Sequence, residues 1–205
     1  MTEAQAILFW LSGVFTPSNS DVLFNAVLKG DRSFNNLSTL IGFQELYDQL
    51  SLGLINDLEY CQTIYDETHL IIKPETITER ILTSITPNKS IYEIINLLPE
   101  NYQLWLIVDY PDTWFNKISE RLEIHQSFPM ERMIVLSKCG LSNISPDLFE
   151  YLPNHINLPI DRCLLVDNNT KRILKAINYG LPSIIYVNAQ RLKREFILRK
   201  FISKS

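Results

Sequence analysis

The feature that most constrains the fold is an unbroken apolar run near the start of the chain, AILFWL at residues 6–11. A serine and a glycine, Ser12 and Gly13, end this run. A short apolar run that stops at a glycine is typical of a strand in a parallel sheet whose two faces are both covered by helices. In open α/β sheets, ligands bind beyond the carboxyl ends of the strands. We therefore expect a functional site near residues 10–14.

Length and composition limit the class of protein. The chain has 205 residues, of which 46% are hydrophobic and 20% are charged, as in ordinary globular proteins. This length allows one domain with a modest insertion. The net charge of −4 argues against nucleic acid as a partner. No apolar run approaches the roughly 18 residues that a membrane span needs, and the first residues lack the basic start of a signal peptide.

The cysteines and histidines indicate neither a disulfide framework nor a zinc site. Cys61, Cys139 and Cys163 are far apart, odd in number and without a Cys-x-x-Cys pair. We interpret them as reduced thiols of a cytoplasmic protein. None of the three histidines has the spacing of a metal ligand.

The remainder of the chain alternates between helical and strand patterns. Residues 22–82 are mostly helical by the spacing of their apolar side chains, and Gly53 is expected to break a helix. Further helices are expected at 91–98, 114–122 and 190–201. Further strands are expected at 103–108, 133–136, 163–168 and 183–187.

Residues 9–14, FWLSGV, resemble the first motif of the haloacid dehalogenase (HAD) superfamily, Phe-Asp-x-Asp-Gly-Val. The framework residues of the motif are kept, but Trp10 and Ser12 replace its two aspartates. In the family, the first aspartate is the nucleophile that takes up a phosphoryl group and also holds Mg²⁺, and the second is the general acid/base. The resemblance therefore implies that neither role survives in this chain.

The second and third motifs of the family are also altered. Val108 and Asp109 stand where the family has Ser-Asn or Thr-Asn after a strand, so the hydroxyl that binds phosphoryl oxygens is absent and a carboxylate that repels phosphate is present. Asn143 stands at the position of the phosphate-binding lysine. Lys138 lies five residues too early for the motif, and we favour a solvated side chain over a substitute for that lysine.

The fourth motif keeps a single carboxylate. Asp167 matches its first aspartate, Asn168 replaces the second, and Arg172 replaces a later asparagine. Asp167 is either a metal ligand or a structural residue that caps the following helix, and we favour the structural role because a divalent cation needs more oxygen ligands. The resemblance implies no cofactor, except Mg²⁺ if hydrolase activity remains.

The order of the elements matches the family along nearly the whole chain and predicts its fold. We expect an α/β, Rossmann-like, HAD-type parallel sheet of about five strands flanked by helices, with a small helical cap inserted after the first strand. Residues 1–15 and 88–205 would form the core, and residues 16–87 the cap. The most similar branch is that of sugar-phosphatase-like members, which includes the N-terminal domain of epoxide hydrolase.

Three hypotheses for the function remain open. In the first, the chain has lost phosphohydrolase chemistry and serves a binding or regulatory role, with another protein or a second copy as its partner; aromatic residues of the cap are candidate contacts. In the second, the old pocket binds a neutral or cationic small molecule. In the third, the chain is a hydrolase that uses Asp109, Asp112 or Asp167. The candidate contacts are Phe34, Phe43 and Tyr47, and the candidate pocket residues are Trp10, Ser12, Asp109, Asn143 and Asp167.

The C-terminal segment, residues 190–201, reads as a basic amphipathic helix. Its basic side could dock an acidic partner or a membrane surface. We favour a plainer interpretation, in which the helix packs on the sheet through its apolar side and leaves its basic side in water.

Overall fold

The computed structural model describes residues 4–19, 21–22, 37–68, 73–143, 145 and 147–203. Its core is a five-stranded parallel sheet in the order β3-β2-β1-β4-β5, which confirms the predicted α/β, Rossmann-like class. The strands are β1 (Ala6–Trp10), β2 (Gln103–Val108), β3 (Met133–Val135), β4 (Cys163–Asp167) and β5 (Ser183–Ile185).

The apolar run that opens the chain forms the central strand, β1. It pairs with β2 on one side and β4 on the other, and all its side chains are fully buried. Phe9 packs edge-to-face against Phe15, Phe128 and Phe196, with ring centroids 5.7–6.5 Å apart. A strand enclosed on both edges and both faces has no water-facing position, which explains why its sequence is apolar without alternation.

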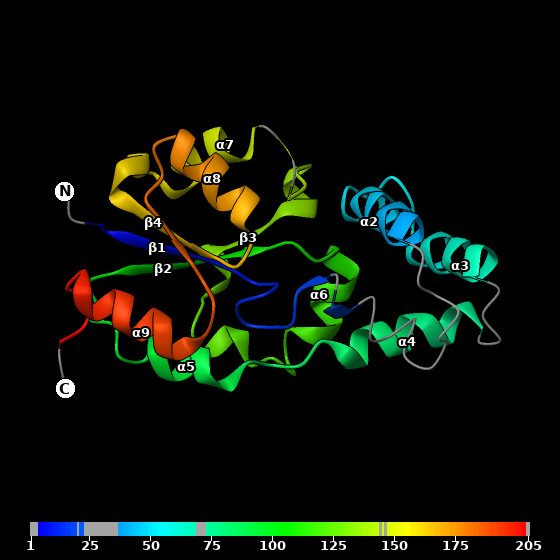
Figure 1. The fold of residues 1–205 in the computed structure, drawn as a ribbon, viewed down its shortest axis with the longest axis horizontal. Coiled ribbons are helices and arrows are strands. Elements are labelled where there is room, and N and C mark those ends of the chain that lie inside the picture. The colour runs from blue at the N-terminus through cyan, green and yellow to red at the C-terminus, as the bar shows by residue number, and fades with distance from the viewer. Residues whose placement is uncertain are drawn as a thin grey trace.

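Helices cover both faces of the sheet. In Figure 1, α7 and α8 lie on one face, and α5 and α9 lie on the other. The fifth core helix, α6, follows β2 at the carboxyl edge and ends earlier than the predicted 114–122, because residues 119–123 form turns and Glu123 takes a left-handed φ of 54°. The bounds are α5 (Lys89–Ile95), α6 (Asp112–Ile118), α7 (Leu148–Ile156), α8 (Thr170–Asn178) and α9 (Ala189–Leu198).

Helix α9 packs as the plainer interpretation of the basic tail predicts. Leu192 and Phe196 are buried against the core, whereas Arg191 and Arg194 are exposed. The side chain of Asn188 caps the helix by accepting a hydrogen bond from the Arg191 N–H at 2.8 Å. The apolar side of α9 therefore covers the sheet, and its basic side faces water.

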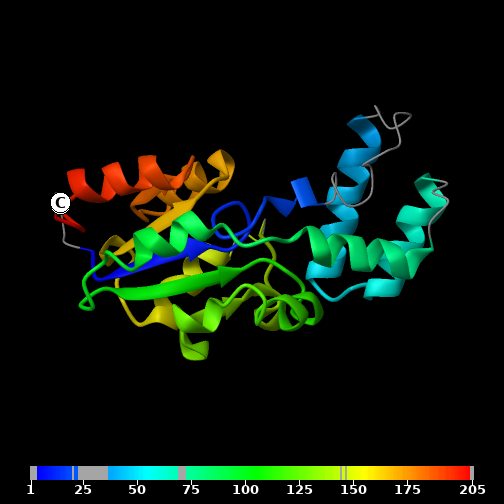
Figure 2. The same ribbon diagram turned by 90° about the horizontal axis from the view of Figure 1, so that it is seen from below.

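Among the described residues between β1 and β2, the helices α2, α3 and α4 lie beyond the carboxyl edge of the sheet (Figure 1, and Figure 2 from below). Their bounds are α2 (Leu37–Ser51), α3 (Asp57–Thr68) and α4 (Pro74–Ser84). Gly53 follows α2 with a φ of 71°, a conformation that favours glycine, and so ends the helix where the sequence predicts a break. The predicted helical residues 23–36 lie outside the described residues. The boundaries of a cap at 16–87 stay a prediction.

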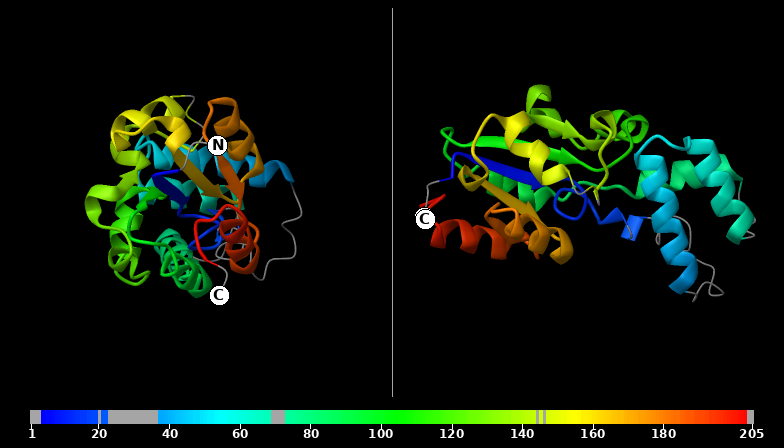
Figure 3. Two further views of the ribbon diagram at one scale, coloured as in Figure 1. Left: turned by 90° about the vertical axis from the view of Figure 1, so that its left-hand side faces the viewer. Right: turned by 90° about the horizontal axis from the view of Figure 1, so that it is seen from above.

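An aromatic cluster joins two of these helices, α2 and α3, to the core. The rings of Tyr47 (α2), Tyr60 (α3) and Trp114 (α6) lie 5.8–6.3 Å apart, centroid to centroid. At the rim, Asp57 accepts a hydrogen bond from the Thr113 hydroxyl at 3.0 Å. Figure 3 shows how the helices extend away from the core at this edge. None of the described helices is long and apolar enough to cross a membrane.

Candidate functional site

The carboxyl ends of β1 and β4 meet where the strand order changes direction, which is where α/β sheets bind their ligands. Trp10 is the last residue of β1, and Asp167 is the last residue of β4. Both side chains are fully buried. The topology thus brings together the first motif and the fourth, although they are more than 150 residues apart in the sequence.

Arg172, in the first turn of α8, joins these two strand ends. Its Nε donates to Asp167 Oδ2 at 2.6 Å, and its Nη2 donates to Asp167 Oδ1 at 2.8 Å. Its guanidinium carbon lies 4.0 Å from the centroid of the Trp10 ring. A planar guanidinium can form both contacts at once, one in its plane and one through its face. Arg172 is therefore held between the nucleophile position and the remaining carboxylate.

The Asp167 carboxylate is stabilised by donors rather than by water. Besides Arg172, it accepts the backbone N–H of Asn169 at 3.0 Å. Burial raises the pKa of this carboxyl, and the hydrogen bonds and charge of Arg172 oppose that rise. The oxygen that caps α8 belongs to Asn169, which accepts from the Arg172 N–H at 3.1 Å, so the role predicted for Asp167 as the cap is wrong.

Asp109, just beyond β2, is the second buried carboxylate at this edge. Its Oδ1 accepts the Ser12 backbone N–H at 3.2 Å, and its Oδ2 accepts the Ser12 hydroxyl and the Asn19 amide, the latter at 3.0 Å. The Tyr47 hydroxyl of α2 donates to the Asp109 backbone carbonyl at 3.0 Å. The Asp109 carboxylate thus accepts hydrogen bonds from three donors of the loop after β1.

The other motif positions are dispersed. Val108 is fully buried at the end of β2 and offers no polar group. Lys138 forms an ion pair with Asp112 at 2.8 Å and lines a different cavity, so it does not substitute for the missing lysine.

Asn143 and Asn168 face the same cavity as Ser12 and Asp109. A Cβ at Gly13, whose φ is 81°, would collide with the Asn168 side chain, so this glycine allows the two loops to approach.

A cavity of about 560 Å³ lies between the core and α2 at this edge. Three of the five predicted pocket residues line it, namely Ser12, Asp109 and Asn143. The other two, Trp10 and Asp167, are buried and do not line it. Space for a small molecule therefore remains beside Arg172, which covers Trp10, and polar side chains line it.

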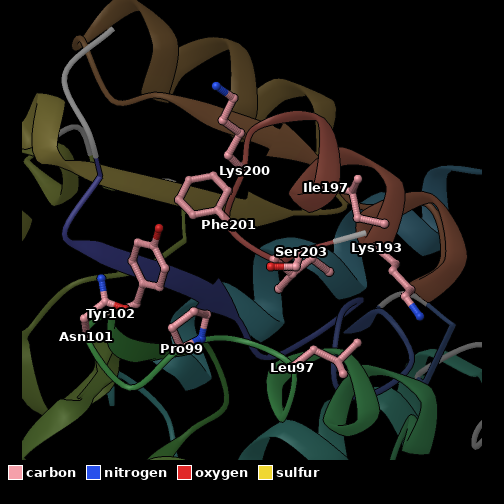
Figure 4. Close-up of a pocket in the computed structure, with 10 residues that line it drawn as sticks. Leu97, Pro99, Asn101, Tyr102, Lys193, Ile197, Lys200, Phe201 and Ser203 are labelled. Atoms are coloured by element: carbon pink, nitrogen blue, oxygen red, sulfur yellow. The ribbon is translucent and has the colours of Figure 1, made fainter. Parts of the chain in front are cut away.

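Two more cavities lie elsewhere. One of about 760 Å³ lies at the opposite edge of the sheet, where Tyr102 and Phe201 pack edge-to-face and Lys193 and Lys200 stand at the rim (Figure 4). The other, about 680 Å³, lies between the loop after α2 and Lys138. Neither cavity is lined by Trp10, Ser12, Asp167 or Asn168, the motif residues at the ends of β1 and β4.

Two of the aromatic residues predicted as partner contacts are not at the surface. Phe43 and Tyr47 are buried, Tyr47 within the aromatic cluster that joins α2 to the core. Phe34 lies outside the described residues. Burial of large apolar rings is the commoner outcome, because they contribute most when removed from water.

Comparisons with known proteins identify the fold. No protein family model matches the sequence, and a search of curated proteins finds no match. A HAD family enzyme from Bacteroides thetaiotaomicron has a similar structure, with a TM-score of 0.76 and 12% identity over 95% of this chain and 99% of that chain. L-2-haloacid dehalogenase from Xanthobacter autotrophicus, with chloropropionic acid covalently bound, has a TM-score of 0.64 and 13% identity over 97% of this chain and 86% of that chain.

The chain therefore has the fold of the haloacid dehalogenase superfamily, and the resemblance seen in its motifs is confirmed at the level of the fold. The Bacteroides enzyme has also been solved in complex with magnesium and inorganic phosphate. That structure has a TM-score of 0.69 and 14% identity over 90% of this chain and 94% of that chain.

The side chains at the carboxyl edge of the sheet in this chain do not fit a magnesium ion. Mg²⁺ requires an octahedron of oxygen ligands. Trp10 offers no oxygen, both oxygens of Asp167 are taken by Arg172, and those of Asp109 are taken by Ser12 and Asn19. Within the described ranges, no three histidine, cysteine or acidic side chains are grouped so that they could hold a metal. A metal bound by the Asp167 carboxylate would have to compete with Arg172.

Sequence reasoning missed three contributors. Asn19 lies outside the four motifs, yet its amide donates a hydrogen bond to Asp109. Asn88, which returns the chain to the core, bonds the carbonyls of Val14 and Phe15 and so fixes the loop after β1. Arg172 was noted only as a replacement. Its position five residues after Asp167, in the first turn of a helix, is the signal that could have suggested the ion pair.

Proposed function

We propose that this chain is a HAD-fold protein that has lost phosphohydrolase chemistry and serves a binding or regulatory role. The observation that supports this best is the arrangement of Trp10, Arg172 and Asp167. Phosphoryl transfer in this fold needs an attacking carboxylate and a metal ion held beside it. In this chain the indole of Trp10 stands where the attacking carboxylate would be. The guanidinium of Arg172 binds Asp167, the motif carboxylate that is left to hold a metal ion.

The surroundings of Asp109 support the same proposal. A transferred phosphoryl group needs hydrogen-bond donors aimed at its oxygens. The N–H and hydroxyl of Ser12 and the amide of Asn19 already donate to Asp109. A negative charge built into the protein therefore competes with an anionic substrate for these three donors.

The remaining parts of the proposal concern place and partner. We assign the protein to the cytoplasm, where its free thiols Cys61, Cys139 and Cys163 would stay reduced. A regulatory role requires a macromolecule that responds to it, and we propose another protein or a second copy of this chain.

Hydrolysis of p-nitrophenyl phosphate in the presence of Mg²⁺ tests the loss of chemistry. We expect the wild type to be no faster than buffer. A variant combining Trp10→Asp, Ser12→Asp and Arg172→Asn, which restores the carboxylates and frees Asp167, serves as the matched comparison, and turnover by that variant alone would strengthen the proposal. Wild-type turnover that Asp167→Asn abolishes would overturn it.

A second candidate function is hydrolysis with relocated groups, and one contact favours it. The Ser12 hydroxyl donates to Asp109, which is the arrangement of a nucleophile and its base. Against it, Ser12 is 4% exposed, and its backbone N–H, which an oxyanion would need, also donates to Asp109. Turnover that is lost in both Ser12→Ala and Asp109→Asn would establish this alternative.

A further inference from the structure

All the described residues that line the cavity of about 560 Å³ at the carboxyl edge are polar, and their chemistry favours one class of ligand. Its volume is in the range of small-molecule sites and far larger than a bare ion needs. It lies between the strand ends of the core and helix α2. The question is which of its polar groups are still free to meet a ligand.

The donors are largely committed. The amide of Asn19 and the two donors of Ser12 point to Asp109, and the guanidinium of Arg172 is bound to Asp167. Lys171 is the remaining cationic side chain of the lining, and it is exposed. An anion that entered the cavity would therefore meet donors already bonded to two buried carboxylates, Asp109 and Asp167.

The acceptors, in contrast, are not satisfied. Asn19 is 8% exposed, and within the described part of the chain its Oδ1 has no hydrogen-bond partner. Its orientation is fixed, because a carboxylate such as Asp109 can only accept, so the nitrogen must face Asp109 and the oxygen must face away. Asn143 Oδ1, in the same lining, is also buried without a partner among the described residues. A buried acceptor without a donor is unfavourable, so these oxygens favour a ligand that supplies N–H groups.

A third acceptor adds negative charge. Asp48 of α2 lines the cavity, half-buried, and accepts a hydrogen bond from the Gln44 amide at 3.2 Å. Burial raises the pKa of its carboxyl, because removal from water disfavours the charged form. Because Arg172 is paired with Asp167, Lys171 is the cation that is left in the described lining to balance Asp48 and Asp109.

We propose that this cavity binds a small organic cation, an amine whose N–H groups donate to Asn19 Oδ1, Asn143 Oδ1 and the Asp48 carboxylate. The inference rests on the proposed function, because a cavity that still processed phosphate would keep its donors for an anion. It names the ligand of the same site: a primary amine or guanidine rather than a phosphate ester.

Calorimetric titration of the full chain with 1,4-diaminobutane tests the inference, with 1,4-butanediol as the uncharged probe of similar shape and inorganic phosphate as the anionic one. We expect saturable binding of the diamine only, weakened about tenfold or more by Asp48→Asn, which removes a charge-assisted hydrogen bond. Asp66→Asn is the matched control, because Asp66 also accepts from a glutamine one turn earlier in its helix, Gln62, but does not line the cavity. Circular dichroism checks that both variants fold.

The outcomes separate this inference from the proposed function. No saturable heat with the diamine, equal affinity in wild type and Asp48→Asn, or preferential binding of phosphate would each overturn the inference. Turnover of p-nitrophenyl phosphate would overturn the proposed function, whereas absence of both turnover and diamine binding would overturn the ligand class alone. Asn143→Leu, which removes a second acceptor without touching Asp109, provides an independent check: it should also weaken the diamine, and unchanged affinity would remove Asn143 from the site.

Discussion

Arg172 has an unusual position for a charged side chain, since it lies between the Trp10 ring and the fully buried Asp167 carboxylate. Removing one member of a buried ion pair leaves the other charge without compensation, which typically destabilises a protein by about 3–5 kcal/mol. By contrast, replacing an exposed ion pair has a small effect. The contribution of Arg172 to stability can therefore be predicted from its burial and tested.

Arg172→Ala should lower the free energy of unfolding by about 3–5 kcal/mol, because it leaves Asp167 buried and unpaired. Arg172→Lys keeps the charge but loses the bidentate pair and the stacking on Trp10, so its loss should be smaller. Arg199→Ala, at a half-exposed ion pair with Glu195, is the control and should change stability by less than about 1 kcal/mol. Urea unfolding gives all three values, and equal effects of Arg172→Ala and Arg199→Ala would contradict this reading of the site.

At the scale of the elements, one hydroxyl of the aromatic cluster also bonds α2 directly to the core. Tyr47 donates to the Asp109 carbonyl, whereas the hydroxyl of its neighbour Tyr60 is buried without a hydrogen-bond partner in the described part of the chain. The two rings belong to the same cluster and are both fully buried. They form a matched pair that differs in whether the hydroxyl is used.

Tyr47→Phe should destabilise the protein by about 1–3 kcal/mol, because the Asp109 carbonyl loses its donor in a buried place. Tyr60→Phe should be neutral or slightly stabilising, because it removes a buried hydroxyl that has no partner. Thermal unfolding followed by calorimetry measures both. A greater loss in Tyr60→Phe than in Tyr47→Phe would show that the packing of the rings, and not the hydrogen bond, attaches α2.

The elements also show how far sequence reasoning reaches. Strand β2 and its neighbours were predicted nearly to the residue, because buried parallel strands leave an unmistakable apolar run between turns. Helix α6 was predicted to continue to Leu122, because Ile118 and Leu122 keep the helical spacing, but a turn also buries both side chains. The positions of Ser12, Asp109 and Asp167 followed from the motifs, whereas their hydrogen bonds did not, because Asn19 and Arg172 meet them only in three dimensions.

At the scale of the whole molecule, stability should fall at alkaline pH, where tyrosines whose pKa is raised by burial begin to ionise. Tyr92 of α5 donates to the Leu122 carbonyl at 2.6 Å, and burial raises the pKa of its hydroxyl from 10.0 to about 12. A group whose pKa is higher in the folded state stabilises fully below its unfolded pKa, and this contribution is lost as the pH rises through the folded value.

We therefore expect the wild type to lose stability between about pH 10 and pH 12. Tyr92→Phe should be less stable at pH 8, where the hydrogen bond to Leu122 is missing, but its stability should fall less steeply above pH 10. Urea midpoints measured from pH 8 to pH 12 give both curves. Parallel curves would mean that Tyr92 does not contribute to the alkaline loss.

The fold of the whole molecule is that of hydrolases, and the proposed loss of their chemistry is the central claim. Turnover depends on the choice of substrate, but metal binding does not, so titration with Mg²⁺ followed by calorimetry tests the claim most directly. We expect no saturable heat at millimolar Mg²⁺ for the wild type, because Arg172 binds both oxygens of Asp167. Saturable binding by the wild type that disappears in Asp167→Asn would contradict it and return this chain to the metal-dependent enzymes.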